Sequence, residues 1–187
     1  MKKKRRPVTF LERSEVDALL AEADRHSDSL AGIFALCYWA GLRLHEAVKV
    51  AWGDVRWEGE IPVKLYVIGK GGVEAWLALA KPLQGRLRRR IELRNRPDQP
   101  VFPSRWDKFY SHRAVQQAMV RFGKAVGIPR DKLHPHALRH SLGTHLDEAG
   151  ASPVVIQNLL RHQNLATTSI YLHSSTRRQR EALDLLA

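Results

Sequence analysis

The sequence is poor in cysteine and in long apolar runs. Its 187 residues include one cysteine, Cys37, which cannot form a disulfide within the chain. We expect Cys37 to be a buried thiol in a reducing compartment. The apolar run around it, residues 33–40, is shorter than the roughly 20 residues that a membrane-spanning helix needs. No apolar segment follows the basic N-terminus, so we expect no secretory signal, no membrane-inserted segment and a cytoplasmic protein.

Acidic residues are outnumbered by basic ones, 19 to 31, which gives a formal net charge of +12 and an isoelectric point near 10.3. This balance favours a polyanionic partner, with nucleic acid the first candidate and an anionic membrane surface the second. The basic run at residues 2–6 is either a solvated tail or an arm that follows DNA. Its candidate DNA contacts are Lys3, Lys4, Arg5 and Arg6.

Apolar periodicity and capping residues predict helices with three short strands between them. Ser14 is expected to cap the first helix and Gly41 to end the second. Pro82 is expected in the first turn of an arginine-rich helix, where Arg86 and Arg89 face either DNA or solvent. The expected helices include 14–24, 30–40, 43–50, 113–126 and 167–172, and the expected strands are 54–58, 63–68 and 73–79.

The segment from His134 to His173 concentrates imidazole, guanidinium and phenol groups. His136 and Arg139 are three residues apart and share one face of a helix, together with His140. We expect this face to present Arg and His outward, while a separate leucine stripe packs on the core. Arg suits phosphate oxygens, and Tyr171 can attack phosphorus to form a covalent ester. These residue types therefore suggest chemistry on a phosphate.

Two upstream motifs add basic groups. Gly41-Leu-Arg43 is followed by Glu46, and Lys70 lies in the glycine turn Gly69-Lys70-Gly71-Gly72, which is expected to join two strands. Gly71 stands where a P-loop would have Ser or Thr, so the turn is not a nucleotide-binding loop. With these parts, the sequence resembles the tyrosine recombinase (phage integrase) family, from about residue 10 to the C-terminus. The matching catalytic positions, in family order, are Arg43, Lys70, His136, Arg139, His162 and Tyr171.

The resemblance implies a fold and a reaction. The implied fold is α+β, mainly α-helical with a small three-stranded antiparallel sheet: the DNA breaking-rejoining fold of tyrosine recombinase catalytic domains. In the implied reaction Tyr171 is the nucleophile, His136 its proton acceptor and Lys70 the acid for the departing 5′-oxygen. Arg43, Arg139 and His162 would bind the phosphate, while Glu46 and His140 would support these groups. No metal and no cofactor is expected, and rejoining needs no ATP.

The resemblance also implies an organisation and partners. We expect a basic arm at residues 1–9 and a catalytic domain at 10–187, whose tail, 174–187, exchanges with a neighbouring subunit. A separate N-terminal core-binding domain is not expected. The implied partners are double-stranded DNA, further copies of the chain in a tetrameric synaptic complex, and accessory DNA-bending or directionality proteins. The protein is expected at the nucleoid.

The chain departs from its relatives at two positions. Arg161 stands where relatives commonly have Gly, just before His162, and Glu74 stands where they usually carry basic residues after the hairpin. Three other functions stay open. A type IB topoisomerase would use a related site, and a non-catalytic DNA-binding regulator would retain the fold alone. A metal hydrolase could use His136 and His140, although Ala137 stands where a metalloprotease motif has its Glu.

Overall fold

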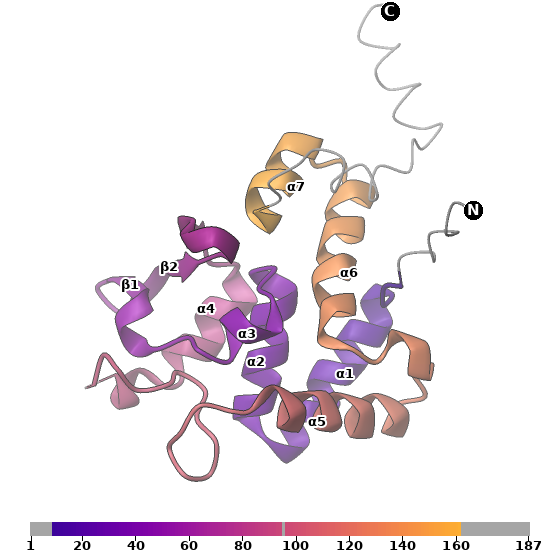
Figure 1. The fold of residues 1–187 in the computed structure, drawn as a ribbon, viewed down its shortest axis with the longest axis horizontal. Coiled ribbons are helices and arrows are strands. Elements are labelled where there is room, and N and C mark those ends of the chain that lie inside the picture. The colour runs from indigo at the N-terminus through magenta and orange to yellow at the C-terminus, as the bar shows by residue number, and fades with distance from the viewer. Residues whose placement is uncertain (1–8, 95, 162–187) are drawn as a thin grey trace, which may run out of the picture.

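The structure is a computed structural model that describes residues 9–94 and 96–161. The described part of the chain is mostly helical with one sheet (Figure 1), which confirms the expected fold class. The helices are α1 (Arg13–His26), α2 (Asp28–Trp39), α3 (Leu44–Ala47), α4 (Lys81–Arg88), α5 (His112–Ala125), α6 (Pro135–Glu148) and α7 (Pro153–Leu160). The strands are β1 (Val55–Glu58), β2 (Ile61–Ile68) and β3 (Glu74–Ala78), and short 3-10 turns occur at Trp52–Asp54, Lys70–Gly72, Ile91–Leu93 and Arg130–Lys132.

Helix α2 is the centre of the core. It is apolar on almost every face, and its residues from Leu30 to Tyr38 are all buried, as expected for a helix surrounded by protein. It packs against α1, α4 and α6. Gly32 lets the ring of Phe102 approach, since a Cβ there would lie 2.1 Å from the ring. Cys37 is fully buried in this helix, and burial raises the pKa of its thiol to about 12. The prediction of a buried thiol is therefore confirmed.

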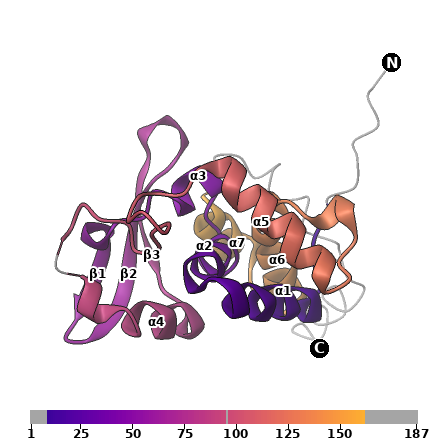
Figure 2. The ribbon, with the colours of Figure 1, turned by 90° about the horizontal axis from the view of Figure 1, so that it is seen from below.

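The three strands form an antiparallel sheet in the order β1-β2-β3. The β2–β3 register pairs Lys64 with Ala78 and Ile68 with Glu74. The turn between them contains the 3-10 turn Lys70–Gly72, in which Gly71 and Gly72 have φ of 79° and 77°. Such angles favour glycine, so the predicted hairpin is confirmed. Figure 2 shows the sheet with α4 at one end of the molecule, α1, α5 and α6 at the other, and α2 between them.

Several predicted boundaries are wrong. Helix α1 begins at Arg13, before the expected cap Ser14, because the backbone N–H of Glu12 donates to Glu15 at 2.8 Å. The expected third helix, 43–50, ends early as α3, at Ala47. The expected helix at 167–172, the tail 174–187 and all but one residue of the arm 1–9 lie outside the described residues. In the part of the chain that the structure describes, no helix is both long and apolar enough to cross a bilayer.

Candidate active site

The corner between α2 and α3 positions the first arginine. Gly41 follows the end of α2 with φ of +58°, a conformation that a side chain strains. Arg43 is the N-cap of α3, and its backbone N–H donates to Glu46 Oε2 at 2.8 Å. Its guanidinium Nη1 donates to Glu46 Oε1 at 3.1 Å. Glu46 thus bonds both the backbone and the guanidinium of Arg43.

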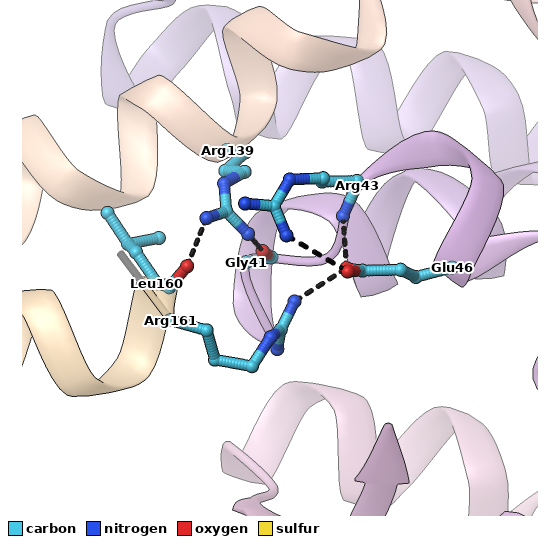
Figure 3. Close-up of polar contacts among 6 residues, drawn as sticks. All are labelled: Gly41, Arg43, Glu46, Arg139, Leu160 and Arg161. Carbon is cyan, nitrogen blue, oxygen red and sulfur yellow. Dashed lines mark hydrogen bonds and ion pairs between the residues drawn. The ribbon is translucent and has the colours of Figure 1, made fainter. Parts of the chain in front are cut away.

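Arg139 of α6 reaches the same corner. Its guanidinium donates through Nη1 to the carbonyl of Gly41 and through Nη2 to the carbonyl of Leu160, at the end of α7 (Figure 3). The residue is 2% exposed. The expectation that this helix face presents its arginine outward is therefore wrong. The side chain lies in the wall of the site, where it joins α6, α7 and the α2–α3 corner and is held in one orientation.

Arg161 brings a further guanidinium to Glu46. It caps the C-terminus of α7 in the left-handed conformation, with φ of 51° and ψ of 46°. Its Nη2 donates to Glu46 Oε2 at 2.5 Å, and Figure 3 shows Arg43 and Arg161 approaching Glu46 from two elements. Sequence reasoning noted Arg161 only as a replacement of glycine. Its partner lies far away in the sequence, so no local pattern could have revealed the pair.

His136 and His140, two of the three histidines of α6, are less buried than Arg139. His136 is exposed, and its ring meets that of His140 edge-on with centroids 4.6 Å apart. The pKa of His136 is lowered from its ordinary value, first because neighbouring atoms desolvate the ring and then because Arg139, His134 and Arg43 place positive charge near it. His136 is therefore neutral at pH 7, the form that accepts a proton. His134 has a structural role, since its Nδ1 accepts the backbone N–H of Ala137 at 3.1 Å.

The β2–β3 turn that carries Lys70 lies beside this cluster. A Cβ placed on Gly69 would be 4.0 Å from both Arg161 Nε and Glu46 Oε1. A side chain at the position before Lys70 would thus contact the ion pair of Glu46 and Arg161. The sheet and the helices therefore contribute to one site.

The predicted residues are partly brought together. The described structure gathers Arg43, Glu46 and Arg139, with the Lys70 turn alongside. His162 and Tyr171 lie outside the described residues. Among residues 9–94 and 96–161, no group of three or more metal-ligand side chains occurs.

The candidate DNA contacts on α4 need a correction. Arg86 donates from both terminal nitrogens to Asp24, at 2.5 Å each, and its side chain is 10% exposed. It is therefore a cross-link between α4 and α1, and the expectation that it faces DNA or solvent is wrong. Arg89, at the end of the same helix, is exposed. Lys3, Lys4, Arg5 and Arg6 lie outside the described residues.

The fold is that of tyrosine recombinase catalytic domains. The structure superposes on the crystal structure of XerA recombinase with a TM-score of 0.75 and 23% identity, over 99% of this chain and 65% of that one. It also superposes on the catalytic domain of bacteriophage HP1 integrase with a TM-score of 0.70 and 21% identity, over 95% and 94% of the two chains. At such identities these likenesses concern the fold.

The chain belongs to the phage integrase family, whose model matches residues 9–178. The tyrosine recombinase XerA of Pyrococcus horikoshii is 35% identical over 181 residues, 93% of this chain and 60% of that protein. The tyrosine recombinase XerC of Actinobacillus pleuropneumoniae is 37% identical over 141 residues, 74% of this chain and 45% of that protein. The chain thus spans about half the length of these relatives.

Proposed function

We propose that the chain catalyses site-specific DNA recombination by cleaving and rejoining strands through a 3′-phosphotyrosyl intermediate. The observation that carries this proposal is the convergence of Arg43 and Arg139, from α3 and α6, on the corner formed by Gly41 and Glu46. Two fixed guanidiniums can neutralise the charge that develops on the non-bridging oxygens of a phosphodiester. Family membership and the tyrosine at position 171 supply the nucleophile.

The proposed step transfers the DNA phosphate from the 5′-oxygen to Tyr171. The Tyr171 oxygen bonds to phosphorus, the bond from phosphorus to the 5′-oxygen breaks, and Lys70 protonates that oxygen. The phenol proton passes to His136, which is neutral at pH 7 because its pKa is lowered. His162 donates a hydrogen bond to a non-bridging oxygen, while Glu46 and His140 support the arginines and His136. Attack of a 5′-hydroxyl on the phosphotyrosine reverses the step without ATP.

The proposed reaction implies DNA and further copies of the chain as partners. The related XerH recombinase was solved bound to its difH substrate, and the structures share a TM-score of 0.78 with 21% identity. We infer that this chain binds double-stranded DNA at the nucleoid, with the arm 1–9 and the exposed Arg89 as additional contacts. Recombination further requires several copies, for which a tetramer linked by the tail 174–187 is proposed, and accessory DNA-bending or directionality proteins are proposed to assist it.

A suicide substrate tests the reaction. Duplex DNA from the region flanking the gene, nicked so that cleavage is trapped, is incubated with the protein and resolved on a denaturing gel. We expect a covalent adduct that persists in EDTA and is absent in Tyr171→Phe. Strand cleavage without an adduct, abolished by EDTA, would point to a metal hydrolase, and DNA binding without cleavage or adduct would point to a regulator. Relaxation of supercoiled plasmid without strand exchange would point to a topoisomerase.

A further inference from the structure

Arg161 is a buried cation with more donors than acceptors. Its side chain is 7% exposed, and Nη2 is engaged by Glu46. Its other two guanidinium nitrogens, Nε and Nη1, are buried without a hydrogen-bond partner among the described residues. Burial lowers the pKa of Arg161, a trend that Glu46 opposes and the nearby Arg43 reinforces. The side chain is thus held at the site with its charge incompletely compensated.

The backbone of Arg161 adds a second cost. A left-handed conformation is strained for a residue with a side chain, and glycine commonly takes this position after a helix. Arg161 adopts it with φ of 51°. Glycine here would relieve the strain and avoid desolvating a guanidinium. Because folding alone favours glycine, the arginine is explained better by what its charge does in the site.

Glu46 is shared between two cations. The Arg161 pair is shorter, at 2.5 Å, than the contact of Arg43 with the same carboxylate, at 3.1 Å. One carboxylate can compensate one guanidinium, so Arg43, Glu46 and Arg161 together carry one net positive charge. Without Arg161, Glu46 and Arg43 would form a neutral pair, and a phosphate would have to compete with Glu46 for Arg43.

We propose that Arg161 is a third arginine of the phosphate site: a positioning residue that occupies Glu46 and so leaves the Arg43 guanidinium to a DNA phosphate oxygen. The inference rests on the proposed function in one respect, that the anion at the site is a DNA phosphate. Arg43 is the member of the cluster that a phosphate can reach, because its side chain is 25% exposed whereas those of Glu46 and Arg161 are nearly enclosed. Removing Arg161 should therefore weaken the hold on phosphate without unfolding the protein.

Two measurements on full-length Arg161→Gly test this. The first is the salt dependence of binding to mixed-sequence duplex DNA, where losing one cation should reduce the slope of log K against log salt by about one. The second is the rate of adduct formation on nicked duplex, expected to fall roughly tenfold, less than the effect of a donor that touches the phosphate. Thermal unfolding should not be weakened, since glycine removes the backbone strain.

Glu46→Gln supplies the discriminating variant, because a glutamine keeps an acceptor for the Arg43 backbone but carries no charge. If Arg161 acts by occupying Glu46, then Glu46→Gln placed in the Arg161→Gly protein should restore the salt slope and much of the rate. Failure of this rescue would overturn the proposal and assign the effect to displacement of the neighbouring His162. An unchanged salt slope in Arg161→Gly would also overturn the proposed role of Arg161. If the wild type still formed the adduct, the proposed function would be unaffected. A wild type without adduct but with the predicted slopes would overturn only the proposed function.

Discussion

Two clusters in the described part of the molecule pair arginines with acids from other elements, and they differ in the number of acids. The α4 ion-pair cluster consists of Arg86, Arg90, Asp24 and Asp28: Arg86 bonds Asp24, and Arg90 bonds Asp28 at 2.5 Å. The Glu46 cluster consists of Arg43, Arg161 and Glu46, with two guanidiniums on one carboxylate. The first cluster is neutral, and the second carries a net positive charge.

The surroundings of the two clusters differ as well. In the α4 ion-pair cluster the aspartates are 40% and 43% exposed, so water shares in their solvation. In the Glu46 cluster the Glu46 side chain is 2% exposed, and Arg139 lies alongside with backbone carbonyls as its partners in Figure 3. An unpartnered nitrogen alone does not separate the clusters, because Arg90 Nε also has no hydrogen-bond partner among residues 9–94 and 96–161. What distinguishes the Glu46 cluster, among the described residues, is a net positive charge on side chains that are mostly enclosed, which favours an anionic ligand.

Replacing Arg43 should have the largest effect on activity. In Arg43→Gln we expect adduct formation on nicked duplex to fall about 100- to 1000-fold, or about 3–4 kcal/mol, because a preorganised donor to the transition state is lost. Thermal unfolding should change little, since Glu46 keeps Arg161 as a partner. Single-turnover rates and melting temperatures together measure this. A variant that melts much earlier would show that Arg43 is structural.

Replacing Arg86 should produce the opposite pattern. In Arg86→Gln we expect a loss of about 1–3 kcal/mol of unfolding free energy, nearer the lower figure because Asp24 is partly exposed. Denaturant titration measures the loss, and a double-mutant cycle with Asp24→Asn isolates the pair. The salt slope of DNA binding should stay at the wild-type value. A reduced slope with normal stability would return Arg86 to the DNA interface.

Replacing Gly41 should affect both stability and adduct formation. The backbone of Gly41 has φ of +58°, and a Cβ added there would lie 2.8 Å from Leu160 Cδ2. Gly41→Ala should therefore cost about 1–2 kcal/mol of backbone strain plus the cost of that contact. Gly127→Ala is the matched control, because its φ is +77° with nothing within 4 Å of the added Cβ. Adduct formation should fall only in Gly41→Ala, whose carbonyl accepts from Arg139. Equal stability loss in both would mean that Leu160 moves aside.

The smallest expected effect is on the titration of His136. Its pKa lies below the ordinary 6.5, through desolvation and then through Arg139, His134 and Arg43. Since the unfolded chain then binds the proton more readily, this residue's contribution to stability is complete above pH 6.5 and is lost as the pH falls below it. In Arg43→Gln the pKa should rise toward 6.5, as read from the histidine proton resonances by NMR. Arg86→Gln should leave it unchanged, and a similar rise there would contradict a local charge effect.

Much of the fold was accessible from the sequence because it depends on local patterns. The apolar residues of α2, the glycines of the β2–β3 turn and the proline that opens α4 each predicted an element that the structure contains. Boundaries failed where a specific cap decided them, as when the contact between Glu12 and Glu15 placed the start of α1 before Ser14. The resemblance implied a supporting role for Glu46, and its contact with Arg43 is local because the two residues lie within one helical turn.

The partners of the buried arginines could be found only from the tertiary structure. From the sequence, Arg86 was expected to face DNA or solvent, and Arg161 was noted only as a replacement of glycine. In the structure Arg86 is neutralised by an aspartate of α1, and Arg161 shares Glu46 with Arg43. The sequence by itself determined which residue types and elements are present, because helix caps, glycine turns and apolar periodicity act between near neighbours. Only the tertiary structure decided which cations are compensated, because the energy of a buried charge depends on partners that folding brings from distant parts of the chain.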